Sequence, residues 1–248
     1  MIQAKHLRRD GIVTDDPMPI HEVDAIVAHF TGACVHRYHV AKTDVENCSY
    51  QEALDKQWAY FAASFNDVVM APHWLERAIS HYNDAKTYFS GRSPYLYSLN
   101  AFWTFPSSQI YSDTQGWHRD DSDGPDQFTV FMFGTDVNFS GRHQYARGSN
   151  NMPYRSPDPF YGAEPPEDIV TSVYGPRGTI IVEDTHGLHR AASTLDTPRL
   201  LLWARWNTSS VPFESYTKDG LSPFPKEMLG DRYPKDPVLQ DAIQLLVR

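Results

Sequence analysis

The sequence lacks several features that would each point to a particular class of protein. No apolar run in its 248 residues approaches the roughly 20 residues that a membrane-spanning helix requires. Residues 1–10 contain no apolar core, so they do not resemble a secretory signal, and we expect a cytoplasmic location. Cysteine is rare: without an export signal, Cys34 and Cys48 are expected to be free thiols. These absences disfavour an integral membrane protein and a disulfide-stabilised secreted domain.

The sequence also has fewer basic than acidic residues. The chain has 22 Lys and Arg against 31 Asp and Glu, a formal net charge of −9, and its longest basic run is Arg8-Arg9. A nucleic-acid-binding protein needs a clustered basic surface, so we predict no nucleic-acid partner. A small-molecule substrate, including a small acidic one, is compatible with this charge. The sequence predicts no particular oligomeric state.

Helical patterns dominate the first part of the chain. In one segment apolar residues recur at i, i+3, i+4 and i+7, which is the stripe of an amphipathic helix. Further helices are predicted over residues 51–64 and 72–82. The residues of the apolar stripe are Val23, Ile26, Val27 and Phe30.

From residue 95 the pattern changes to short runs rich in Val, Ile, Tyr, Phe and Trp, bounded by turn residues. Many short strands without helices between them favour a sandwich or a barrel. We expect one domain over residues 1–248: a mainly helical layer (1–94), a β core (95–207), and a C-terminal loop and helix (208–248). The predicted strands cover residues 95–105, 127–133, 142–146, 169–174, 179–183 and 199–206, the last helix covers 237–247, and long Pro-rich loops cover 153–166 and 210–237.

The chemically most informative stretch is residues 116–120, with the sequence GWHRD. Side chains at i and i+2 of a β-strand point to the same face, so His118 and Asp120 would converge on one point. Two histidines and one carboxylate hold Fe(II) on one face and leave its other positions open. The spacing alone is weak in a chain with 11 histidines, and the alternative is a surface segment that ends in an Asp-rich turn.

A second segment supplies candidate partners for this pair. The predicted strand over residues 179–183 is followed by His186 and His189, and either histidine can complete the set. Arg199 begins the next predicted strand and can pair bidentately with a carboxylate inside the barrel. The alternative for Arg199 is a surface arginine at a strand start.

In this order, the motifs resemble the phytanoyl-CoA dioxygenase-like branch of the Fe(II)/2-oxoglutarate-dependent oxygenases. The resemblance covers most of the chain; each segment is loose by itself, and the ordered set is specific. The segments are residues 7–13, 71–73 and 88–94 in the helical part, WHRD at 117–120, residues 135–137 and 141–149, and residues 178–199 with the distal histidine and the arginine.

The resemblance implies a double-stranded β-helix, the cupin-like jelly roll, with iron bound at its mouth. It implies His118, Asp120 and His189 as metal ligands, because the family's distal histidine lies about ten residues before the arginine, and His186 lies thirteen before it. Arg199 would hold the distal carboxylate of 2-oxoglutarate, and Asn100 would contact the same cosubstrate. The implied cofactors are Fe(II), 2-oxoglutarate and O2.

The implied reaction is hydroxylation of a small-molecule metabolite with release of succinate and CO2. Desaturation, cyclisation or epimerisation at the same site is the alternative, and a non-catalytic jelly-roll binding module is the alternative of another class. The carboxylate of Asp120 favours oxygenation over halogenation, since halogenases of this superfamily have a small residue there. Ala191 departs from the family, which often has a hydroxyl at this place, so we expect Thr194 or a tyrosine to support Arg199.

Overall fold

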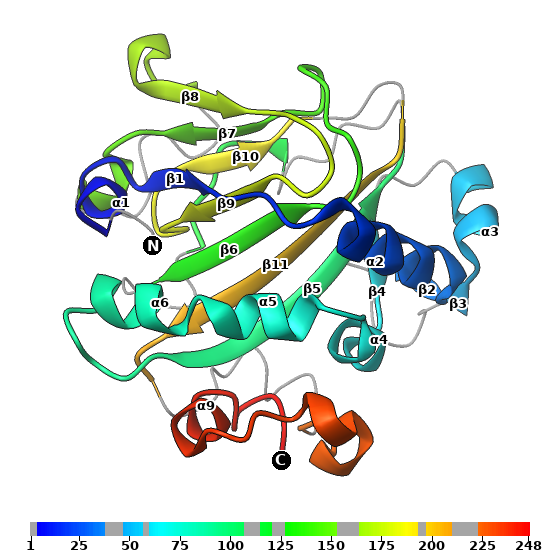
Figure 1. Ribbon diagram of the computed structural model, residues 1–248. Coiled ribbons are helices and arrows are strands. Elements are labelled where there is room, and N and C mark those ends of the chain that lie inside the picture. The colour runs from blue at the N-terminus through cyan, green and yellow to red at the C-terminus, as the bar shows by residue number, and fades with distance from the viewer. Residues whose placement is uncertain are drawn as a thin grey trace.

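A computed structural model describes residues 4–37, 47–56, 60–106, 115–120, 127–152, 164–192, 197–209 and 223–248. Its strands form two antiparallel sheets that face each other (Figure 1). The large sheet has the strand order β1 (Ile12–Asp15), β9 (Ile180–Glu183), β6 (Phe128–Phe133), β11 (Arg199–Asn207), β5 (Tyr95–Thr104), β4 (Tyr60–Ala63), β2 (Val35–Arg37) and β3 (Asn47–Cys48). The small sheet has the order β10 (His189–Ala191), β7 (His143–Ala146) and β8 (Val170–Val173).

The chain passes repeatedly from one sheet to the other. It runs from β5 in the large sheet to a bridge between His118 and His189 in the small one, then to β6, to β7 and β8, and back to β9. It finishes with β10 in the small sheet and β11 in the large one. This alternation of two facing antiparallel sheets is the double-stranded β-helix, or jelly roll. The predicted fold class, mainly β with N-terminal helices and a jelly-roll core, is confirmed.

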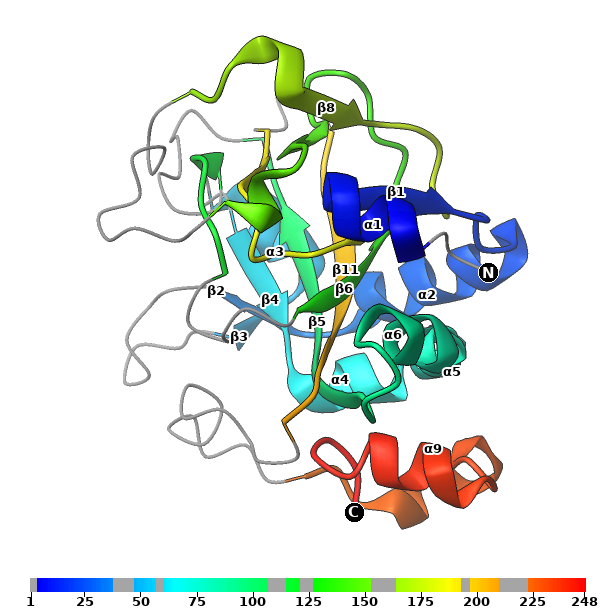
Figure 2. The same ribbon diagram turned by 90° about the vertical axis from the view of Figure 1, so that its left-hand side faces the viewer.

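The helices cover the outer face of the large sheet (Figure 2). Along β11, Leu200, Leu202 and Trp206 belong to the same buried cluster as α2 and α5 side chains. The alternate residue Leu201 packs in the barrel interior with Phe131 and Ile181. Since both faces of the central strands are covered, their sequences read as nearly continuous apolar runs. The helices are α1 (Ala4–Asp10), α2 (Ile20–Gly32), α3 (Tyr50–Asp55), α4 (Phe65–Met70), α5 (Trp74–Ser80) and α6 (Tyr82–Tyr88).

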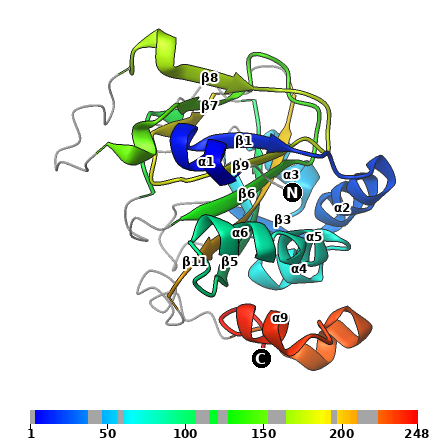
Figure 3. The same cartoon turned by 60° about the vertical axis from the view of Figure 1, so that its left-hand side comes forward.

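The C-terminal segment lies at the opposite end of the molecule from β8 (Figure 3). It contains the 3-10 helix η5 (Lys226–Arg232) and α9 (Pro237–Ala242), which is shorter than the predicted 237–247. Two further 3-10 turns, η3 (Ser149–Asn151) and η4 (Glu167–Ile169), lie beside the small sheet. Within the described ranges, no helix is long and apolar enough to cross a membrane.

The helix predicted over residues 51–64 is wrong in its second half. Ser49 caps α3, because its hydroxyl accepts a hydrogen bond from the amide of Glu52 while the Glu52 carboxylate accepts from the Ser49 amide. The helix ends at Asp55, and Tyr60–Ala63 forms the fully buried strand β4. A short apolar run fits a buried helix turn and a buried strand equally well, so the pattern could not separate them. No strand was predicted before residue 95, yet β1 and β4 both belong to the large sheet.

Candidate metal centre

The structure brings His118, Asp120 and His189 together at the mouth of the barrel. One potential ligand atom from each lies within 4.8 Å of the others. The two histidines are cross-strand partners: the amide of His118 donates to the carbonyl of His189 (3.1 Å), and the amide of His189 donates back (3.0 Å). Asp120 is fixed by its amide, which donates to the carbonyl of Thr185 (2.9 Å). Main-chain pairing therefore sets the positions of all three side chains.

Both imidazoles are oriented in the same way. The Nδ1 atom of His118 lies 2.9 Å from the carbonyl oxygen of Gly116, and Nδ1 of His189 lies 2.9 Å from that of Gly187. A carbonyl only accepts, so each Nδ1 carries a proton, and Nε2 is the ring nitrogen left to bind a metal ion. Burial, helped by the neighbouring His189, lowers the pKa of His118 to about 4. His118 is therefore a neutral imidazole at neutral pH, as a metal ligand must be.

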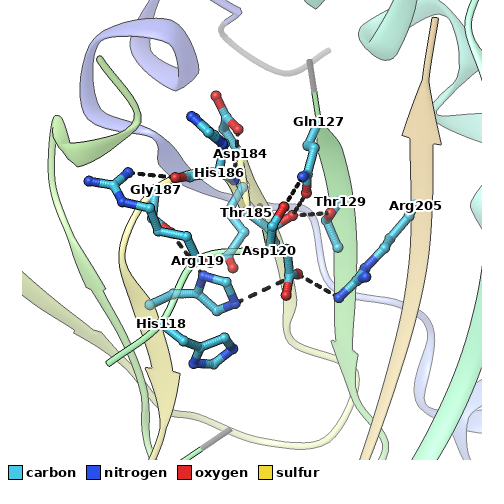
Figure 4. A network of polar contacts seen from close by, with 12 residues as sticks. His118, Arg119, Asp120, Gln127, Thr129, Asp184, Thr185, His186, Gly187 and Arg205 are labelled. Atoms are coloured by element: carbon cyan, nitrogen blue, oxygen red, sulfur yellow. Dashed lines mark hydrogen bonds and ion pairs between the residues drawn. The ribbon is translucent and has the colours of Figure 1, made fainter. Parts of the chain in front are cut away.

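Asp120 is held by a polar network that Figure 4 shows from close by. Nη2 of Arg205 lies 2.5 Å from Oδ2 of Asp120. Burial acts to raise the pKa of Asp120, but Arg205 and the two imidazoles outweigh it, so the net shift is downward and the carboxylate is ionised. The carbonyl of Asp120 accepts from the Gln127 amide group, and Gln127 in turn accepts from the hydroxyl of Thr185.

The turn before β10 decides which histidine reaches this centre. Arg119 points away from the centre and donates to the carbonyl of His186 (2.5 Å) (Figure 4). It also donates to the carbonyl of Ser149 (2.9 Å). A Cβ atom on Gly187 would lie 1.8 Å from the Tyr145 hydroxyl, so only glycine fits the turn. The described residues that cluster as potential ligands include His189 and not His186.

Arg199 lies at the other end of the barrel interior. It is 3% exposed, and its Nη1 donates to the carbonyls of Gly141 and Ala192, while Nη2 lies 3.4 Å from the Thr104 hydroxyl. Among the described residues, no carboxylate pairs with it and its Nε has no hydrogen-bond partner. Burial lowers the pKa of the guanidinium and the nearby phenol of Tyr60 raises it, but an arginine stays charged. A buried cation without an anion is costly, so this position fits a bound carboxylate.

Tyr60 is a candidate for the tyrosine that was expected to support Arg199. Thr194 lies outside the described residues, whereas Tyr60 of β4 and Arg199 of β11 both pair with Thr104 of the strand between them. Asn100 faces the same interior nearer the metal centre, where it lies opposite Trp203 and donates to the Ser98 hydroxyl (2.6 Å).

The aromatic residues that could line a pocket mostly do not face this interior. Trp103 and Phe128 pack in the core between the large sheet and the helices. Trp117 packs on the outer face of the small sheet, and its indole donates to Glu164 (2.9 Å). Trp203 lies inside, stacked on Phe102 with ring centroids 4.4 Å apart and planes at 4°. Tyr111 lies outside the described residues.

Some interior polar residues were missed in the sequence. Arg205 is one, although it lies six residues after Arg199 and strand alternation puts both on one face. A second is the buried pair of His143 and Glu183, with Nε2 and Oε2 2.7 Å apart. The ring of His143 lies 6.1 Å from that of His189. No sequence signal pointed to this pair, because its residues come from different sheets.

Comparison with known proteins places the fold in one class of enzymes. No family model and no curated protein matches the sequence, but solved structures of non-haem, 2-oxoglutarate-dependent enzymes match over most of its length. The chain therefore has the jelly-roll fold of this class.

Three of these structures show how far the similarity extends. The carbocyclase SnoK from nogalamycin biosynthesis is 15% identical, with 89% of this chain and 90% of that chain covered at a TM-score of 0.59. The epimerase SnoN, solved with Fe3+, alpha-ketoglutarate and nogalamycin RO, is 16% identical over 84% and 82% at 0.58. EvdO2 from Micromonospora carbonacea var. aurantiaca, complexed with 2-oxoglutarate, is 14% identical over 82% and 88% at 0.56. At such low identity the likeness establishes the fold alone.

Proposed function

We propose that this protein is an Fe(II)- and 2-oxoglutarate-dependent dioxygenase that hydroxylates a small-molecule metabolite, releasing succinate and CO2. The observation that carries the proposal is the convergence of His118, Asp120 and His189 at one end of a barrel whose interior also holds the buried Arg199. We further assign the chain to the phytanoyl-CoA dioxygenase-like branch, on the ordered motifs of the sequence. Cytoplasmic location and the absence of a nucleic-acid partner stay predictions.

The residues present fit the implied metal. Two imidazoles and one carboxylate on one side of a site are the donor set of non-haem Fe(II) oxygenases. Both imidazoles have their Nδ1 atoms engaged by main-chain carbonyls, which leaves Nε2 of His118 and of His189 as donors. The carboxylate of Asp120 would be the third ligand. Bound iron, with 2-oxoglutarate, supplies the activation of dioxygen.

The residues also fit the cosubstrate. Arg199 would hold the distal carboxylate of 2-oxoglutarate with both arms of its guanidinium, supported by the hydroxyl groups of Thr104 and Tyr60. Asn100 would contribute a polar contact nearer the metal. Between these groups, Phe131 and Leu201 line the interior and exclude water from the reaction.

Other outcomes at the same site are the alternative reading. Desaturation, cyclisation and epimerisation need the same metal and cosubstrate, and SnoK and SnoN are named as a carbocyclase and an epimerase. A non-catalytic jelly-roll module is disfavoured by Arg199, because within the described ranges no carboxylate pairs with its guanidinium, and a buried charge that lacks a counter-ion destabilises a protein.

The test is the formation of succinate from 2-oxoglutarate without added substrate, measured with and without Fe(II). We expect iron-dependent turnover in the wild type and none in Asp120→Ala or His189→Ala. His186→Ala is the matched control, since it removes a histidine from the same turn outside the cluster. Iron-independent turnover would overturn the proposal. Loss of iron binding in His186→Ala with normal binding in His189→Ala would overturn the choice of ligand.

A further inference from the structure

The interior face of β11 carries two arginines. Alternation places Arg199, Leu201, Trp203 and Arg205 on this face, with Arg199 opposite Thr104 and Arg205 opposite Ser98 of β5. At a rise of about 3.3 Å per residue, the Cα atoms of the two arginines lie about 20 Å apart along the strand. Arg199 therefore marks one end of this row, and Arg205 marks the end at the metal centre.

Arg205 forms an ion pair with a residue of the candidate metal centre. Its Nη2 lies 2.5 Å from Oδ2 of Asp120 (Figure 4). Its guanidinium lies 5.7 Å from the ring centroid of Trp203. Its neighbours across the sheet are neutral: Thr129 on β6 and Ser98 on β5. Beyond Thr129 in the same row lies Glu183, whose carboxylate pairs with His143.

The wall between the two arginines is apolar. Trp203 stacks on Phe102, and Leu201 packs with Phe131 and Ile181. The indole Nε1 of Trp203 is buried and, in the described part of the chain, has no hydrogen-bond partner. An apolar wall with a guanidinium at each end suits a dicarboxylate, which carries one charge at each end of an aliphatic chain.

We propose that Arg205 is a second anchor for the cosubstrate, acting on the end of 2-oxoglutarate that shares the metal ion with Asp120. Arg199 holds the other end. The inference rests on the proposed function, because it needs a metal and a 2-oxo acid at this site. Any anion that shares a metal ion with Asp120 lies in the field of Arg205, since Arg205 is one hydrogen bond away from that carboxylate.

The consequence is that the two ends of the cosubstrate are recognised separately. A 2-oxo acid without the distal carboxylate, such as 2-oxopentanoate, loses the contact with Arg199 but keeps the one with Arg205. Removal of Arg205 should therefore weaken both acids equally, whereas removal of Arg199 should weaken 2-oxoglutarate alone. An Arg205 that acted only through Asp120 would weaken the binding of Mn(II) as well.

The experiment is anaerobic calorimetric titration of both acids into protein saturated with Mn(II). For Arg205→Met we expect both dissociation constants to rise by the same factor, roughly 10- to 100-fold, as for the loss of one charged hydrogen bond. The dissociation constants of Arg205→Lys should lie between those of the wild type and of Arg205→Met, because lysine keeps the charge and lacks the planar guanidinium. Arg177→Met is the control: it removes an arginine that pairs with Asp24 at the surface (2.8 Å) and should change neither constant.

Separate titrations of Mn(II) alone and thermal melts distinguish the outcomes. The inference is overturned if folded, Mn(II)-saturated Arg205→Met binds 2-oxoglutarate as tightly as the wild type. It is also overturned if this variant weakens 2-oxoglutarate but not 2-oxopentanoate, or if it no longer binds Mn(II), because Arg205 would then act only through Asp120. Failure of the wild type to bind 2-oxoglutarate with Mn(II) present would instead overturn the proposed function.

Discussion

Asp184 provides a quantitative test of how the turn between β9 and β10 is built. The residue is 4% exposed, its Oδ2 accepts from the phenol of Tyr88 on α6 (2.6 Å), and its Oδ1 accepts from the amide of His186 (3.1 Å). Burial raises the pKa of Asp184 to about 6 from an ordinary value of 3.8, although both hydrogen bonds act to lower it. The carboxyl group of Asp184 thus links α6 to the turn, and its burial lowers the stability of the protein when the group is charged.

The sign and size of that cost follow from the pKa. A carboxyl group whose pKa is higher in the folded protein binds its proton more tightly there, so the free energy of unfolding falls as pH rises from about 4 to about 6. A shift of the pKa from 3.8 to about 6 corresponds to a loss of about 3 kcal/mol in the free energy of unfolding, and this loss is complete above pH 6. Asp184→Asn keeps the shape and one acceptor but has no charge. We expect it to stabilise the protein at pH 8 by up to about 3 kcal/mol and to have little effect at pH 4.

The assay is urea unfolding of the wild type and Asp184→Asn between pH 4 and pH 8. Tyr88→Phe is the complementary variant: it removes a hydrogen bond to the charged form and should destabilise more at pH 8 than at pH 5. Asp24→Asn, at an exposed ion pair with Arg177, is the control and should show no such dependence. A difference between Asp184→Asn and the wild type that is the same at every pH would refute the reasoning.

Three further predictions concern the candidate metal centre. Because the pKa of His118 lies at about 4, its imidazole should stay neutral down to pH 5 and titrate as pH approaches 4, which NMR of the metal-free protein would measure; a His118 titration centred near pH 6.5 would contradict it. Gly187→Ala should cost at least a few kcal/mol in urea unfolding and abolish Mn(II) binding, since its Cβ would overlap the Tyr145 hydroxyl; wild-type stability would show that the turn relaxes freely. Tyr60→Phe should weaken 2-oxoglutarate binding several-fold with Mn(II) affinity unchanged, and an unchanged 2-oxoglutarate affinity would remove Tyr60 from the support of Arg199.

Much of the β core was predictable because its signal is local. Each strand predicted from residue 95 onward forms, with bounds shifted by one or two residues at most. The short strand His189–Ala191 was not predicted, since three residues carry no measurable alternation. Tyr60–Ala63 was assigned to a helix because a buried strand and a buried helix turn have the same composition.

In the candidate site, too, the local features could be predicted from the sequence and the long-range ones could not. The i and i+2 spacing of His118 and Asp120 is a property of one strand, so the sequence alone could place these two side chains together. The choice between His186 and His189 needed the family's spacing, and the structure brings His189 to the pair through main-chain bonds with His118. That pairing joins segments about seventy residues apart, and no local pattern records it.

The neighbours of Arg205 and Tyr60 were accessible only through the tertiary structure. Their positions depend on which strands are neighbours: β6 and β5 flank Arg205, and β5 lies between Tyr60 and Arg199. Strand order is set by the burial of apolar faces over the whole chain, which sums contributions from residues far apart in sequence. Periodicity therefore determined which side chains share a face of one strand, and long-range packing determined which of those faces meet around the site.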